Sequence, residues 1–192
     1  DMHQEGNQIV IENGLLRLRV QQRPLALVGI EQLTSGQQLL RAAAPLGEFT
    51  LNGKIVRVGG LCEQPNHAFL LDEWLADMPA DPLSIPAPAQ LVASKDISER
   101  FAWGRVRSAS QLAHWPPAGK HMRWLVDAGD YEVSVNIELY DGLPLFAHWL
   151  ELRNKADAAI EIDSFASLRL PIVEAESRVE PQRRGVHLPN LY

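Results

Sequence analysis

Short apolar runs separated by turn residues dominate the first third of the chain. Asn13-Gly14, Ser35-Gly36 and Asn52-Gly53 each lie between two such runs. An Asn-Gly pair flanked by apolar residues is the strongest short-range signal for a β-hairpin. Three successive strand–turn–strand units therefore predict a meander of antiparallel strands over residues 1–60.

Residues 131–140 alternate between two faces. One face carries Tyr131, Val133, Val135, Ile137 and Leu139, and the other carries Glu132, Ser134, Asn136, Glu138 and Tyr140. The run over 145–153, after the turn at Asp141-Gly142, is apolar or aromatic on both faces, which predicts a strand covered on both faces. We therefore expect this hairpin in the middle of a large layered β-structure, and a last pair of strands within 158–173.

The segment 66–90 has a different character. Its second half contains Pro79, Pro82, Pro86 and Pro88, and proline removes the N–H groups that strands and helices need. Residues 68–78 are compatible with a short helix or a turn. We predict a long proline-rich loop, which is either an ordered loop with a function or a disordered insertion.

The composition fits one folded domain. The chain has 192 residues, of which 46% are hydrophobic, and this length buries roughly 70% of the unfolded surface. The net charge of −6 argues against nucleic acid and an anionic membrane as partners. No apolar run is long enough to span a bilayer. Cys62 has no second cysteine to pair with and is expected to be a small buried hydrophobe.

Catalytic and cofactor motifs are missing from the sequence. The six histidines show no H-x-x-x-H spacing, which argues against a metal site, although His114 and His121 flank a turn and could meet across it. No P-loop, G-x-G-x-x-G or G-x-S-x-G motif is present, so no cofactor is predicted.

Tryptophans and acids suggest a sugar site. Trp74 lies among Asp72, Glu73, Asp77 and Asp81, and Trp115 lies in a turn. Sugar rings stack on aromatic side chains, and carboxylates bind their hydroxyl groups. The alternative is a solvated acidic loop. Three further tryptophans lie within strand patterns and are expected in the core: Trp103, Trp124 and Trp149.

Two motifs carry a resemblance to a known family. They are Trp115-Pro116-Pro117 with Gly119, and Tyr140-Asp141-Gly142-Leu143-Pro144 followed by Trp149 and Asn154. In this order they resemble the N-terminal β-supersandwich domain of α-galactosidase-like glycoside hydrolases. The resemblance implies an all-β fold, a two-layer antiparallel β-supersandwich like that of galactose mutarotase, spanning residues 1–192.

The same resemblance implies a noncatalytic role. In such enzymes the catalytic carboxylates lie on a following catalytic (β/α)8 domain, so no catalytic residue is assigned and the chain is expected to be a fragment of a longer glycosidase. The loop 66–90 with Trp74 is the candidate for contacts with carbohydrate. The resemblance is compatible with a homo-oligomer, and we expect a periplasmic or secreted location. Two alternatives stay open, an aldose 1-epimerase-like enzyme and a free-standing carbohydrate-binding β-sandwich.

Overall fold

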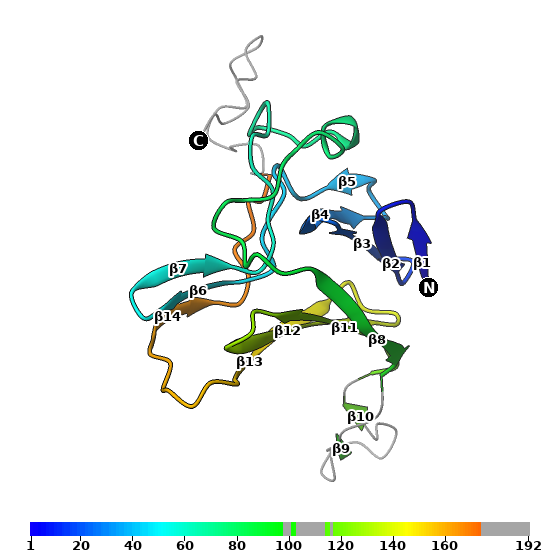
Figure 1. The fold of residues 1–192 in the computed structure, drawn as a ribbon. Helices are drawn as coiled ribbons and strands as arrows, with labels where there is room; N and C mark the ends of the chain where they lie inside the picture. The colour runs from blue at the N-terminus through cyan, green and yellow to red at the C-terminus, as the bar shows by residue number, and fades with distance from the viewer. Residues whose placement is uncertain (98–100, 103–113, 116, 174–192) are drawn as a thin grey trace, which may run out of the picture.

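The computed structural model describes residues 1–97, 101–102, 114–115 and 117–173, and these form an antiparallel all-β sandwich (Figure 1). One layer is a five-stranded sheet in the order β1-β2-β3-β4-β5, and the other is a four-stranded sheet in the order β13-β12-β11-β8. The strands of the first layer are β1 (Met2–Glu5), β2 (Gln8–Glu12), β3 (Leu16–Gln22), β4 (Leu25–Gln32) and β5 (Gln37–Gln38). Those of the second are β8 (Ala89–Asp96), β11 (Gly119–Asp127), β12 (Tyr131–Tyr140) and β13 (Phe146–Asn154).

Two smaller sheets complete the described strands. β6 (Glu48–Leu51) and β7 (Lys54–Arg57) pair with β14 (Ile162–Ala166), and β9 (Phe101–Ala102) pairs with β10 (His114–Trp115). The one helix in the described part of the chain is a single 3-10 turn, η1 (Asp72–Trp74). It is too short to cross a membrane.

The predicted hairpin turns are confirmed. Gly14 and Gly36 have positive φ angles and connect β2 to β3 and β4 to β5. At the third turn both Asn52 (φ 49°) and Gly53 (φ 74°) are left-handed. This is the geometry of a two-residue type I′ turn, which matches the twist of the strands on either side.

The pairing of the hairpins differs from the predicted single meander. The β6–β7 hairpin leaves the first sheet and pairs with β14 instead. β5 is only two residues long, so it offers too little free edge for another strand. The predicted last pair of strands is also wrong, because within 158–173 β14 is followed only by an isolated bridge between Leu40 and Ile172. The neighbouring Pro171 has no N–H to extend that pairing.

The core lies between the two large sheets. It contains Ile11, Leu18 and Leu27 from the first sheet and Trp124, Val135 and Ile137 from the second, each at most 1% exposed. The predicted division of β12 into two faces is confirmed, since Val133, Val135, Ile137 and Leu139 all join this core.

The strand that is buried on both faces is β12, not the predicted run at 145–153. β13 is an edge strand of its sheet and its side chains are half-buried or exposed. β12 lies between two neighbours, and its outer face holds polar residues that are nevertheless buried: Ser134 (2% exposed), Asn136 (1%) and Glu138 (1%). Buried polar groups of this kind need hydrogen-bond partners, and these partners form the site described below.

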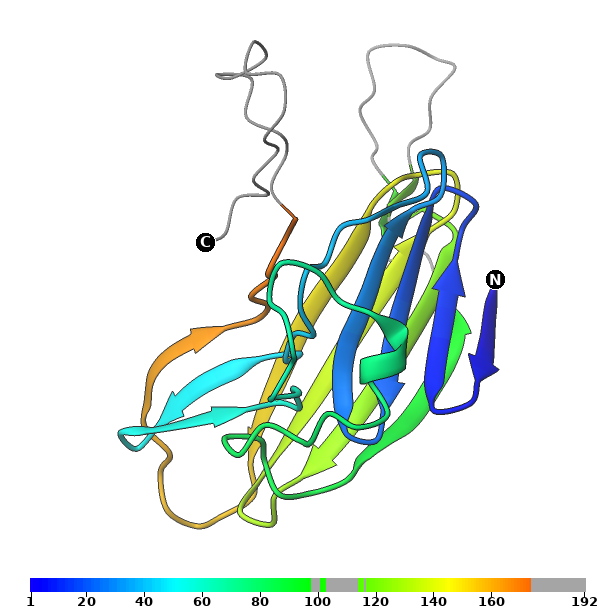
Figure 2. The same ribbon diagram turned by 90° about the horizontal axis from the view of Figure 1, so that it is seen from above.

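The connection between β7 and β8, residues 58–88, is an ordered segment that contains most of the predicted loop. It passes across the outer face of β4, with η1 in front of that strand (Figure 2). Leu61, Leu75 and Met78 form a second apolar cluster there with Ala26 and Val28 of β4. The outer face of β4 is thus covered by apolar packing, whereas the outer face of the second sheet carries polar side chains.

Candidate functional site

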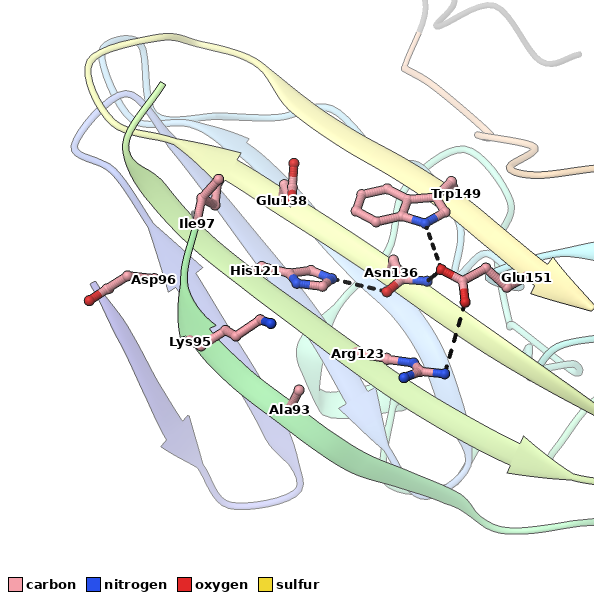
Figure 3. Close-up of a pocket in the computed structure, with 10 residues that line it drawn as sticks. All are labelled: Ala93, Lys95, Asp96, Ile97, His121, Arg123, Asn136, Glu138, Trp149 and Glu151. Carbon is pink, nitrogen blue, oxygen red and sulfur yellow. Dashed lines mark hydrogen bonds and ion pairs between the residues drawn. The ribbon is translucent and has the colours of Figure 1, made fainter. Parts of the chain in front are cut away.

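A recess with a volume of about 250 Å³ lies on the outer face of the second sheet. Side chains from all four of its strands line it (Figure 3). The register explains why they meet. His121 is opposite Lys95 on one side and Glu138 on the other, and Arg123 is opposite Asn136. Trp149 faces Asn136, and Glu151 faces Ser134. Because directly opposite residues share one face of a sheet, these polar side chains form a continuous surface.

Glu151 on β13 is the acceptor that joins three strands. One of its carboxylate oxygens, Oε1, accepts hydrogen bonds from the indole Nε1 of Trp149 (3.2 Å) and the amide Nδ2 of Asn136 (3.3 Å). Its other oxygen, Oε2, lies 3.9 Å from Nη2 of Arg123 on β11. The carboxylate therefore fixes the orientation of the Trp149 ring at the recess.

The hydrogen bonds of Asn136 determine which nitrogen of His121 carries a proton. A carboxylate can only accept, so the Asn136 NH₂ group faces Glu151 and its Oδ1 faces His121 Nε2, 3.0 Å away. Nε2 must then be the donor, and in neutral His121 the other nitrogen, Nδ1, is an acceptor. The imidazole also stacks on the Trp149 ring, with 5.4 Å between centroids and 19° between planes.

Glu138 is a carboxylate that is 1% exposed at the side of the recess. Its Oε2 accepts a hydrogen bond from the buried hydroxyl group of Tyr140 (3.1 Å). Burial of a carboxylate is costly unless donors surround it. Glu138 is thus a carboxylate of the recess lining that a donor of the protein holds in place.

Arg123 is held in place by Ser134. Both Nε (3.1 Å) and Nη2 (2.7 Å) of the guanidinium donate to the Ser134 hydroxyl oxygen. This double contact uses one edge of the guanidinium, while Nη1 has no hydrogen-bond partner in the described part of the chain. A planar guanidinium fixed along one edge presents its remaining donors in a defined direction.

The residues predicted for sugar binding lie elsewhere. Trp74 is half-buried and packs on Phe69 (5.4 Å between ring centroids) and on the second apolar cluster. Asp72 forms an ion pair with Arg19 (2.7 Å), and Glu73 and Asp77 are exposed. Trp115 and His114 belong to β10, and their side chains lie outside the described part of the structure. Trp103 also lies outside the described residues. The recess is therefore not built by the four described candidates.

The prediction that Trp149 belongs to the core is wrong, whereas Trp124 is confirmed as a core residue (1% exposed). A signal for the recess was present in the sequence. Ser134, Asn136 and Glu138 occupy every second position of one strand, and His121 and Arg123 do the same on the strand before it. Polar side chains at every second position of two neighbouring strands predict a polar face that both strands share.

No family model matches the chain, and no curated protein matches its sequence.

Proposed function

We propose that this domain binds carbohydrate in the recess on the outer face of the β8–β11–β12–β13 sheet. The observation that carries the proposal is the chain of hydrogen bonds from Trp149 through Glu151 and Asn136 to His121. It holds an aromatic ring beside a set of planar polar groups. An aromatic face for the C–H surface of a sugar and polar groups for its hydroxyls are the two requirements of sugar recognition.

The shape of the site supports a small polar ligand. Binding pockets for drug-sized molecules enclose roughly 300–1,000 Å³ and are mainly apolar. This recess, at about 250 Å³, is smaller and is lined mostly by charged and amide side chains. A single sugar ring at the end or side of a longer glycan suits this size better than a large apolar molecule.

We further propose that the domain is a noncatalytic part of an α-galactosidase-like glycoside hydrolase. The support is the resemblance in the Trp115-Pro116-Pro117 and Tyr140–Pro144 motifs together with the antiparallel sandwich. In this role the sandwich would pack against a following catalytic barrel, and the recess would hold glycan close to it.

The direct test is a titration of the protein with monosaccharides and oligosaccharides, followed by calorimetry and tryptophan fluorescence. Trp149→Ala removes the ring in the recess, and Trp74→Ala is the matched control on the other sheet. We expect saturable binding that is lost in the first variant and kept in the second. Binding that survives Trp149→Ala, or no binding of any sugar in a broad panel, would contradict a carbohydrate site in this recess.

A second function, aldose 1-epimerase-like activity, is favoured by one specific observation. His121 and Glu138 are directly opposite each other on β11 and β12, and both line the recess. A histidine and a buried carboxylate on the same site are suited to move protons to and from a sugar ring. Polarimetry of freshly dissolved α-galactose or α-glucose tests this, with Glu138→Gln as the variant that should abolish any acceleration over the buffer rate.

A further inference from the structure

The recess has a positively charged side. Lys95 on β8 and Arg123 on β11 both line it, and His121, two residues before Arg123 on β11, is directly opposite Lys95. In Figure 3 the ammonium end of Lys95 points toward His121 and Arg123, and the guanidinium of Arg123 lies on the same side of the recess. Diagonal neighbours across an antiparallel pair are roughly 7–8 Å apart, within reach of one small group held between two long side chains.

Lys95 has no counter-ion in the part of the chain that the structure describes. Its exposed side chain makes no hydrogen bond or ion pair with the residues that the structure describes. Lys120, the lysine on the neighbouring strand β11, is in contrast paired with Asp96, whose pKa is lowered by that contact. Lys95 therefore presents three unused donors and a full charge to the recess.

The acids of the recess are already bound by donors of the protein. Glu151 accepts from Trp149 and Asn136 and lies near Arg123, and Glu138 accepts from Tyr140. These two lie on β12 and β13, on the opposite side from Lys95, and the third acid of the lining, Asp96 on β8, is paired with Lys120. An anion that entered along β8 and β11 would meet Lys95 and the unused Nη1 of Arg123 before it met a free carboxylate.

We propose that the recess selects an acidic sugar, a hexose whose ring carries a carboxylate group, and that this carboxylate binds between Lys95 and Arg123. The inference rests on the proposed carbohydrate-binding function and specifies its ligand class. The planar guanidinium suits a planar carboxylate. The ring then lies toward Trp149, and its hydroxyls reach Asn136 and Glu151.

The experiment compares matched pairs of ligands by calorimetry at pH 7 and low salt. Glucuronate is compared with glucose, and galacturonate with galactose, because each pair differs only at C6, where the uronate has a carboxylate in place of the hydroxymethyl group. A hydrogen bond to a charged group is worth roughly tenfold or more in affinity. We expect the uronates to bind at least about tenfold more tightly, and we expect this preference to shrink as salt screens the charges.

Lys95→Met is the decisive variant, because it removes the charge from an exposed side chain and leaves the sheet intact. Lys54→Met, an exposed lysine on β7 away from the recess, is its control. The preference should disappear in the first variant and persist in the second. Equal affinity for uronates and neutral hexoses, or a preference unchanged by Lys95→Met, would overturn the acidic-sugar inference while leaving the carbohydrate site standing. If neither class of sugar binds, both the acidic-sugar inference and the proposed carbohydrate-binding function are wrong.

Discussion

At the scale of single residues, His148 is a histidine in an apolar environment. It lies on the core face of β13, directly opposite Ile137. Burial lowers the pKa of its imidazole from 6.5 to about 4, because a protonated ring loses its hydration there. The folded protein therefore resists protonation of this ring, whereas the unfolded chain accepts the proton near pH 6.5.

This difference predicts a specific dependence of stability on pH. Above pH 6.5 the ring is neutral in both states and has no effect. Between pH 6.5 and 4 the unfolded state binds more protons, so the free energy of unfolding should fall as pH falls, by about 3 kcal/mol over the window at 1.36 kcal/mol per pKa unit. Urea unfolding at several pH values measures it.

The matched variants are His148→Leu and His67→Leu, the second at an exposed histidine. The slope of the free energy of unfolding against pH, between pH 6.5 and 4, should flatten only in His148→Leu. Asp96 and Asp127 have pKa values lowered below 3.8 by Lys120 and Lys155. Their stabilisation is present above that pH and is lost below it, so it falls outside the His148 window. An unchanged slope in His148→Leu would refute this assignment.

At the scale of elements, Asn13 connects the two sheets. Its Oδ1 accepts hydrogen bonds from the N–H groups of Leu15 and Leu16 in its own hairpin, both at 2.9 Å. Its Nδ2 donates to the carbonyl oxygens of Tyr140 (2.5 Å) and Leu143 (2.7 Å) in the β12–β13 turn. One side chain thus positions a turn of the first layer on a turn of the second.

Asn13→Ala should lower the free energy of unfolding by about 1–3 kcal/mol, because it leaves backbone groups of two turns without partners. Asn154→Ala is the control. That side chain also bonds to backbone, at Ala156 and Ala158, but within its own turn, and we expect a smaller loss. Chemical unfolding of both variants gives the comparison, and equal losses would show that the link between the sheets contributes nothing extra.

The hairpins were predictable because a turn signal such as Asn52-Gly53 acts over a few residues. The strand that pairs with that hairpin was not predictable, because the pairing of β6 with β14 joins segments more than 100 residues apart. The hydrogen bond between Ser164 and Thr50 is an example. The same limit applies to the site. The polar alternation in β12 is visible in the sequence, but the meeting of Glu151 with Arg123 depends on the register of three strands.

At the scale of the whole molecule, the two sheets are covered in different ways. The first is covered by the connection 58–88, anchored by apolar contacts of Trp74, Leu75 and Met78 and by ion pairs such as Arg57–Asp81 (2.6 Å). The second keeps an open recess on the face of β11 and β12. This asymmetry separates the surface that stabilises the sandwich from the surface proposed to bind a ligand.

Trp74→Ala should therefore lower the free energy of unfolding by about 2 kcal/mol, since it removes a half-buried ring from the second apolar cluster. Trp149→Ala removes a ring of the same size from the recess rather than from an apolar cluster, and we expect a smaller loss. Thermal unfolding followed by circular dichroism compares them. The prediction fails if Trp149→Ala is the more destabilising of the two.

The buried polar face of β12 also has a consequence for how the chain folds. A slip of one residue in its pairing would turn Ser134, Asn136 and Glu138 into the apolar core and expose Val133, Val135 and Ile137 to water. Three desolvated polar groups would make that arrangement far less stable than the native one. These three polar residues of β12 thereby penalise misaligned sheets, so a variant that replaces all three with apolar residues would lose the distinction between its correct and its shifted register.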